Sequence, residues 1–153
     1  MKPYLILQYP YDYIDIALCN KGQIVDHIQE NKITAVQFTI PHIDHLLQQH
    51  NIFIKDLSCI GINTGPGPYN TLRALITTAN GIHFVQKTPL VNACALSLLH
   101  KEHSLESSLA ILNAFAQHVF YAFKTPFLQE QGYCSIEQLI HKINHHPIPM
   151  VLL

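Results

Sequence analysis

The stretch NTGPGPYNTLR at residues 63–73 constrains the fold of this 153-residue chain more than any other. It follows an apolar run at residues 58–62 and leads into a helical pattern that continues to about residue 84. Glycine reaches backbone angles closed to other residues, so the two glycines predict a tight turn between a strand and a helix. Around this strand, turn and helix we expect an α/β domain.

The helix after the turn carries two apolar or small stripes. The first has the spacing of a helix face that covers a sheet: Leu72, Leu75, Ile76, Ala79 and Ile82. The second contains only small side chains: Ala74, Thr77, Thr78 and Gly81. A helix with two packing faces needs two neighbours, and the second is either part of the domain or part of a partner.

Before the turn, the pattern predicts three antiparallel strands at residues 4–7, 13–19 and 24–28, with a tight turn at residues 20–23. An amphipathic helix is predicted over residues 32–49 from a set of apolar residues at helical spacing: Ile33, Val36, Ile40, Ile43, Leu46 and Leu47. Pro41 leaves two alternatives. Either Thr39 caps a helix that begins there, or a longer helix bends at Pro41.

After the turn, a short strand is predicted at residues 88–92 and a helix at 93–99. Strands at 109–114 and 118–123 are expected to pair through a turn at 115–117, and Ser135 is expected to cap another helix. A last apolar run covers residues 149–153. We therefore predict a first lobe at residues 1–105 and a reduced second lobe at 106–153.

Composition excludes several classes of function. Nine basic residues against ten acidic ones, with a net charge of -1, provide no basic stripe for nucleic acid, so RNA is expected to be met only through a partner. The four cysteines lie 35 or more residues apart, which predicts buried thiols and no zinc motif. The chain has no signal-peptide core and no apolar window of membrane-spanning length, so we expect a cytoplasmic protein with no membrane contact.

The glycine turn differs from phosphate-binding loops, because it lacks a lysine and its two prolines remove backbone donors. We expect a rigid turn that sets the angle of the helix, with Arg73 either tying down the loop or reaching a carboxylate of a partner.

The eleven histidines raise the question of a metal site. His141 and His145 share a helix face at i,i+4 spacing, and His42 and His45 form an i,i+3 pair. Two ligands leave a zinc site incomplete, so a histidine-rich surface is favoured, and neither a metal nor another cofactor is expected.

Residues 65–73 together with TANGI at 78–82 and TPLV at 88–91 resemble a family signature, G-P-G-S-F-T-G-L-R followed by A-K-G-L and I-P-L. The family is TsaB, also called YeaZ, a subunit of the bacterial machinery that makes threonylcarbamoyladenosine in tRNA. The order of elements is similar along roughly the whole chain, although only residues 65–73 are specific.

The resemblance implies an actin-like, RNase H-like (ASKHA) lobe with a mixed sheet and flanking helices. It also implies a non-catalytic subunit that binds a TsaD-like catalytic partner and supports threonylcarbamoyl transfer to the adenosine beside the anticodon, with a TsaE-like ATPase joining indirectly. The partner helices would be residues 33–49 and 69–84. The residues expected to bind the partner are Phe38, His42, His45, Gly65, Pro66, Gly67, Tyr69, Arg73, Ala74, Thr77, Thr78 and Gly81.

The chain departs from the family pattern at identifiable positions. Where the family's first strand ends in Asp-Thr-Ser, this chain has Gln8, Tyr9 and Pro10, which argues against nucleotide binding by the lobe. The family's Asp-Ala-Arg in a later strand is Asn113-Ala114-Phe115 here. Two alternatives therefore remain: a metal-dependent, glycoprotease-like hydrolase that uses His141 and His145, and a self-associating module, such as a homodimer, that has lost the tRNA role.

Overall fold

The computed structural model describes the chain except residues 1, 10–11, 104–106, 127, 146–150 and 153. It consists of two compact units. The first contains Met1–Thr64 and Pro68–Ala93, and the second contains Gly65–Gly67 and Cys94–Leu153. The sequence had suggested a boundary about a dozen residues later, beyond the helix that follows Ala93.

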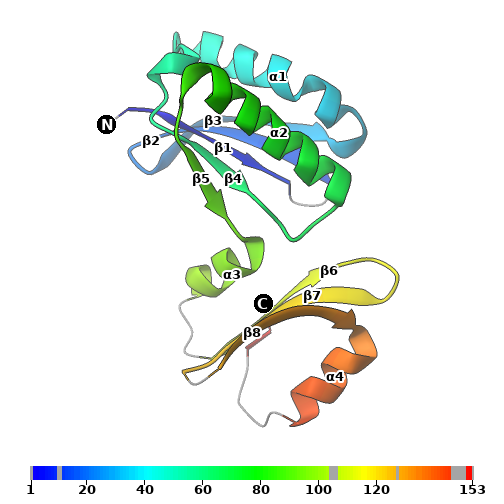
Figure 1. Ribbon diagram of the computed structural model, residues 1–153. Coiled ribbons are helices and arrows are strands. Elements are labelled where there is room, and N and C mark those ends of the chain that lie inside the picture. Colours follow the sequence, from blue (N-terminus) through cyan, green and yellow to red (C-terminus); the bar gives the residue numbers. More distant parts are fainter. Residues whose placement is uncertain (1, 10–11, 104–106, 127, 146–150, 153) are drawn as a thin grey trace. The chain divides into compact units, whose positions relative to one another are not determined.

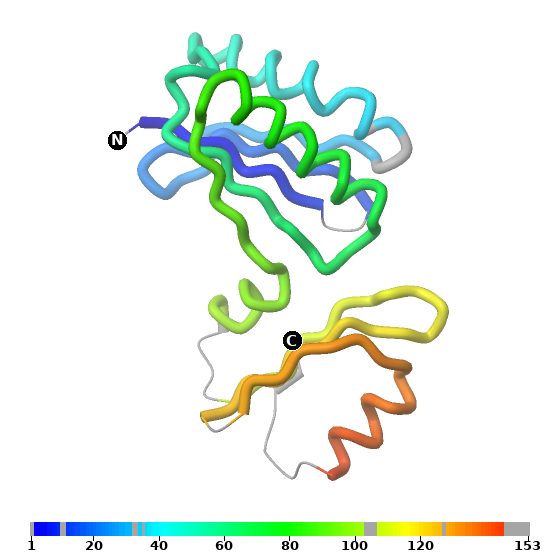
Figure 2. The backbone as a smooth tube through the Cα atoms, in the orientation of Figure 1, coloured from blue at the N-terminus to red at the C-terminus, as the bar shows by residue number. Residues whose placement is uncertain are grey.

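The first unit is built on a five-stranded mixed sheet in the order β3-β2-β1-β4-β5. β1, β2 and β3 form an antiparallel meander, while β4 and β5 run parallel to β1. The turn between β2 and β3 places Lys21 and Gly22 at positive φ, where glycine is favoured. The strands are Tyr4–Gln8 (β1), Tyr13–Asn20 (β2), Gln23–Asn31 (β3), Ile60–Asn63 (β4) and Leu90–Ala93 (β5). Figure 2 traces the same backbone as a tube, with β1 in blue and β5 in green.

Two helices, α1 (Lys32–Gln49) and α2 (Tyr69–Gln86), lie side by side on one face of this sheet (Figure 1). The core is the apolar layer between sheet and helices, with Leu75 of α2 and Leu46 of α1 fully buried. α1 continues through Pro41 without a break, so the longer of the two predicted helices is the one that forms. A short 3-10 helix, η1 (Ile54–Asp56), connects α1 to β4.

The second unit has a four-stranded sheet in the order β8-β7-β6-β9. Alternate residues of β7 enter different clusters, since Tyr121 packs with Leu139 of α4 and Ala122 packs with Leu96 of α3. The two helices therefore cover opposite faces. The elements are α3 (Ala95–His103), β6 (Ser108–Asn113), β7 (His118–Lys124), β8 (Gln129–Ser135), α4 (Ile136–His145) and β9 (Val151–Leu152).

Several predicted features of the second unit are present. Phe115, Ala116 and Gln117 form the turn between β6 and β7, all at positive φ. Ser135 Oγ accepts the backbone N–H of Gln138 at 3.2 Å, and the Gln138 side chain accepts the N–H of Ser135, which makes a reciprocal cap for α4. Of the last apolar run, only Val151 and Leu152 are among the described residues, and they pair with β6. None of the described helices is long and apolar enough to cross a membrane.

Candidate functional site

A groove of about 390 Å³ lies on the first unit between the two helices. Its walls come from α1, from α2 and from η1, the short helix between α1 and β4. The lining carries hydroxyl, amide and apolar groups and no ionisable side chain: Ile40, Ile54, Thr77, Thr78, Gly81, Ile82, Val85 and Gln86. Such a surface suits an apolar ligand or a protein segment.

The small stripe of α2 borders this groove. Ala74 and Thr78 are half-buried, while Thr77 and Gly81 are exposed. A Cβ built on Gly81 would meet no atom within 4 Å, so the floor of the groove is open there. Three residues of the stripe, Thr77, Thr78 and Gly81, line the groove, which is open to another segment at Gly81.

Large apolar side chains are exposed on α1 and α2, and two of them, Ile40 and Val85, line the groove. Phe84 is 75% exposed, Val85 is 70% exposed and Ile40 is 64% exposed. Val36 and Ile40 were expected to pack inward with the rest of the α1 pattern, but both are exposed, whereas Ile43, Leu46 and Leu47 are buried. Of the apolar residues that predicted α1, only those in its second half are buried against the sheet. The side chain of Ile33 lies outside the described residues.

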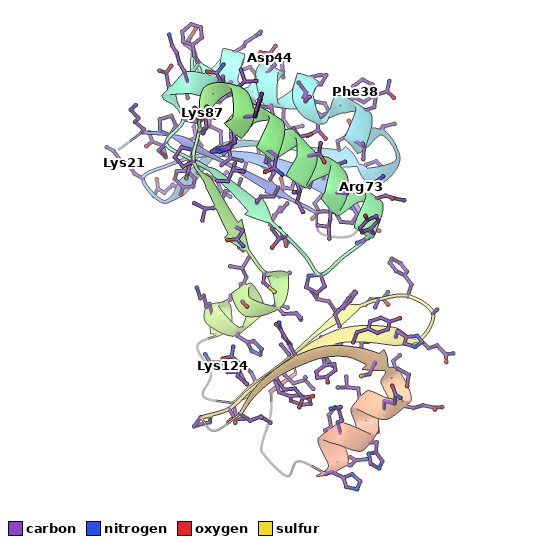
Figure 3. The ribbon with its side chains drawn as sticks, viewed as in Figure 1. Lys21, Phe38, Asp44, Arg73, Lys87 and Lys124 are labelled. Atoms are coloured by element: carbon purple, nitrogen blue, oxygen red, sulfur yellow. The ribbon has the colours of Figure 1, made fainter. Side chains whose placement is uncertain are left out.

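Arg73 lies at the beginning of α2, where its guanidinium carbon stands 5.3 Å from the centre of the Tyr69 ring. Figure 3 shows Arg73 at this end of α2 and Phe38 on α1. Tyr69 is itself 72% exposed, so Tyr69 and Arg73 together place an aromatic ring and a positive charge on the surface at the start of α2. This contact lies within α2, so the two predicted roles of Arg73, tying down the loop and reaching a carboxylate of a partner, both stay predictions.

His42 attaches α1 to the edge strand β3. Its Nε2 lies 3.1 Å from a carboxylate oxygen of Glu30, and its ring is 6.0 Å from that of Phe38. Hydrogen bonds from Thr34 and then from His42 lower the pKa of Glu30. His45 is exposed. Phe38 and His42 thus form a contact pair, whereas the predicted i,i+3 pairing of His42 with His45 has no counterpart among the described contacts.

The turn residues Gly65, Pro66 and Gly67 group with the second unit, while the other nine residues predicted to bind a partner belong to the first. Gly65 has φ of 98°, and the Gly65–Pro66 peptide bond is cis. The Gly65 carbonyl accepts the N–H of Ala95 at 2.8 Å. The Gly65 carbonyl therefore attaches the turn to the first residue of α3.

At the end of β1, the register supplies a carboxylate that sequence comparison missed. Gln8 stands opposite Asp15 of β2, and the Gln8 amide donates to Asp15 Oδ2 at 3.0 Å. Within the described residues, Asp15 Oδ1 is buried without a hydrogen-bond partner. Only the antiparallel pairing of the first two strands could have revealed this neighbour, since seven positions separate the residues in sequence.

The histidines of α4 contact each other. The rings of His141 and His145 stack with centres 4.1 Å apart, and His145 Nδ1 lies 2.8 Å from the His141 carbonyl oxygen. Among the described residues, no three histidine, cysteine, aspartate or glutamate side chains are grouped so that they could hold a metal ion. All four cysteines are free thiols, of which Cys19 and Cys134 are buried.

A family model matches residues 35–132, and it is described as TsaD, tRNA N6-adenosine threonylcarbamoyltransferase. The chain belongs to this family. The matched residues include α2, the groove and most of the second unit. No curated protein sequence matches the chain.

Solved structures confirm the fold. YeaZ from Pseudomonas aeruginosa matches with a TM-score of 0.72 and 19% identity, over 97% of this chain and 71% of that one. A second structure is described as an uncharacterized protein with similarity to peptidase YEAZ from the same organism. It matches with a TM-score of 0.72 and 18% identity, over 100% of this chain and 83% of that one. The ethanolamine utilization protein EutJ from Carboxydothermus hydrogenoformans matches with a TM-score of 0.53 and 9% identity, over 97% of this chain and 58% of that one.

The predicted TsaB (YeaZ) resemblance and actin-like α/β fold are therefore confirmed. Family and fold together support a TsaB-like protein connected with tRNA modification.

Proposed function

We propose that this member of the TsaD family is a non-catalytic, TsaB-like subunit that docks on a TsaD-like catalytic partner through the α1–α2 face. In this role it supports threonylcarbamoyl modification of the tRNA adenosine next to the anticodon, and a TsaE-like ATPase joins the complex indirectly. With a net charge of -1, the chain meets tRNA through the complex.

One observation carries the proposal: the groove is open at Gly81 and lined by exposed Ile40 and Val85, and the neighbouring residue of α2, Phe84, is exposed as well. Burying a side chain of this size contributes about 1.5–3 kcal/mol, so a partner helix that covered the three would gain a large part of a stable interface. Small residues in the groove allow a second helix to approach closely.

The chemistry of the groove supports a role in binding. A general acid or base must be an ionisable side chain within reach of the reacting atoms. The lining offers hydroxyls at Thr77 and Thr78 and an amide at Gln86, and none of these titrates near neutral pH.

The interface is tested by comparing Gly81→Glu with Gly81→Ala in binding to the cognate TsaD-like protein. The Ala Cβ enters open space, so Gly81→Ala should bind within about twofold of wild type. Gly81→Glu places an unpaired charge in an apolar contact and should weaken the complex by more than about 30-fold. Calorimetric titration measures both. Unchanged affinity for Gly81→Glu would remove the groove from the interface.

The role in modification is tested by depleting the protein and analysing tRNA nucleosides by mass spectrometry. Loss of threonylcarbamoyladenosine, restored by wild type and by Gly81→Ala but not by Gly81→Glu, is expected. Retained threonylcarbamoyladenosine after depletion would contradict the proposal.

The same exposed apolar face would also support pairing of two copies across a two-fold axis in the absence of the partner. Light scattering of the free protein and of the mixture separates the two assemblies. If the docking proposal is right, adding the partner converts any homodimer into a heteromeric complex, and Gly81→Glu prevents both.

A further inference from the structure

Two positively charged side chains stand at the two ends of α2. Arg73 lies in the first turns of the helix, and Lys87 is the C-cap residue directly after it. Each contacts an exposed aromatic ring of the same helix. The Arg73 guanidinium carbon lies 5.3 Å from the centre of the Tyr69 ring, and Lys87 Nζ lies 5.1 Å from the centre of the Phe84 ring. Figure 3 shows Arg73 and Lys87 at opposite ends of α2.

Helix geometry places the two cation–aromatic pairs on one face. An α-helix turns about 100° per residue, so the positions of Arg73 and Phe84 differ by only about 20° around the axis. On the same count, Thr77 is about 40° from Arg73. All three are exposed, whereas Leu72 and Leu75 on the other side of the helix are buried. Thr77 lines the groove, so the face that carries the two pairs borders the groove.

The two helices contain little negative charge to offset these cations. The sequence has no aspartate or glutamate from residue 57 to residue 101, so α2 contains no acidic residue. The only acidic residue of α1 is Asp44, whose Oδ2 accepts the Gln48 amide at 2.7 Å. The salt bridges of the described residues involve neither Arg73 nor Lys87. The exposed face of α2 therefore has positive ends and a neutral middle.

We propose that the partner segment docked on the α1–α2 face is a helix with an acidic residue near each end, one paired with Arg73 and the other with Lys87; this inference rests on the proposed function. Both cations keep donors for such pairs, because stacking uses the face of a guanidinium and leaves its N–H edge free, and an ammonium has three donors. The cations are 14 positions apart. The acidic residues should therefore be about four helical turns, or about 21 Å, apart.

A second copy of the chain fits this face less well than an acidic helix. If two α2 helices packed antiparallel across a two-fold axis near Asn80, Arg73 of one copy would meet Lys87 of the other. Salt screens such a repulsion and should strengthen the dimer, whereas it screens the attraction of an acidic helix and should weaken that complex. The direction of the salt effect distinguishes the two occupants.

Association rates test the proposal, with the cognate TsaD-like protein as the probe. Rim charges act mainly on association, so Arg73→Gln and Lys87→Gln should each slow it by about three- to fivefold at about 25 mM salt, with little change in dissociation. At about 500 mM salt the rates of wild type and variants should agree within about twofold. Lys21→Gln removes the same charge in the β2–β3 turn and should stay within about 1.5-fold of wild type at either concentration.

Charge-conserving variants separate the charge from the packing of the side chain. Arg73→Lys and Lys87→Arg should associate within about twofold of wild type at low salt. Equal rates for wild type, Arg73→Gln and Lys87→Gln at low salt would overturn the inference. So would a loss in Arg73→Lys as large as that in Arg73→Gln, or a complex that forms faster as salt is added.

Gly81→Glu separates this inference from the docking proposal. If it abolishes binding while Arg73→Gln and Lys87→Gln associate like wild type, docking through the groove stands and the acidic helix is ruled out. If Gly81→Glu binds like wild type, the docking proposal fails, and this inference fails with it.

Discussion

Each unit of the protein fastens a helix to the edge strand of its sheet, but with different chemistry. In the first unit, His42 of α1 and His50, which directly follows α1, lie 3.1 and 2.8 Å from carboxylates of Glu30 and Asp26 on β3. In the second unit, Glu130 of β8 accepts from both the Tyr121 hydroxyl and the Lys142 ammonium of α4, each at 2.7 Å.

The two attachments differ in how strongly their members depend on one another. The two histidine pairs are partly exposed and independent of each other, whereas the Tyr121–Glu130–Lys142 cluster shares one carboxylate oxygen and includes a buried ring. Losing one member of the cluster affects the others, while the histidine pairs should respond separately.

The largest effect is expected from Gly132→Ala. A Cβ at Gly132 would lie 2.8 Å from the Tyr121 hydroxyl oxygen and 3.0 Å from two ring carbons, so the buried ring, whose hydroxyl bonds to Glu130, must shift. We expect a loss of about 2 kcal/mol in the free energy of unfolding, measured by urea denaturation. Gly81→Ala is the control, because it enters open space on a helix and should be neutral or stabilising by up to about 1 kcal/mol.

Next in size is Tyr121→Phe, which removes the hydroxyl donor and leaves the ring. We expect a loss of about 1 kcal/mol, the usual contribution of one such hydrogen bond. The double variant with Lys142→Met should lose less than the sum of the two single changes, since both donors share Glu130 Oε1. Strict additivity in the urea series would show that the cluster does not act as a unit.

A smaller effect is expected at acid pH in the first unit. Hydrogen bonds from His50 and from the His27 backbone lower the pKa of Asp26, and those from Thr34 and His42 lower that of Glu30. Because the folded pKa lies below the unfolded one, the stabilisation is present above about pH 4 and is lost as pH falls through the folded pKa.

Hydrogen exchange of the α1 amides measures this effect. Protection should fall on acidification in wild type and change less in the variant that combines Asp26→Asn with Glu30→Gln. An equal loss of protection in the two proteins would disprove the role of these carboxylates.

The smallest effect is expected at alkaline pH in the second unit. Hydrogen bonds from Lys142 to Glu130 and Tyr121 raise the pKa of Lys142, while burial and then Glu130 raise that of Tyr121. Both folded values lie above the unfolded ones, so this stabilisation is complete below about pH 10 and is lost as pH rises. Lys142→Met should flatten the alkaline decrease in the urea midpoint without altering the acid one.

The sequence alone predicted the elements whose local residue pattern agrees with their burial in the core. The opening meander, the length of α2, the turn at Phe115 and the Ser135 cap all follow from residues near one another in the chain. β8 was missed because QEQGYCS has no apolar alternation. Its strand conformation depends on pairing with β7, which sequence pattern alone does not specify.

The candidate site was predicted less completely. The small stripe of α2 indicated a second packing face, but periodicity alone placed Val36 and Ile40 in the core, whereas they are exposed. Gln8 and Asp15 meet through strand register.

The three-residue turn at Gly65–Gly67 limits how the protein can be divided. Because these residues group with the second unit and the Gly65 carbonyl binds Ala95, the chain passes from the first unit to the second, back, and across again. Cutting after Ala93 would remove the Ala95 N–H and leave the Gly65 carbonyl of the β4–α2 turn without this donor. A minimal fragment that carries the α1–α2 face should therefore retain α3, or its Gly65–Gly67 turn should be exchanged for a designed loop.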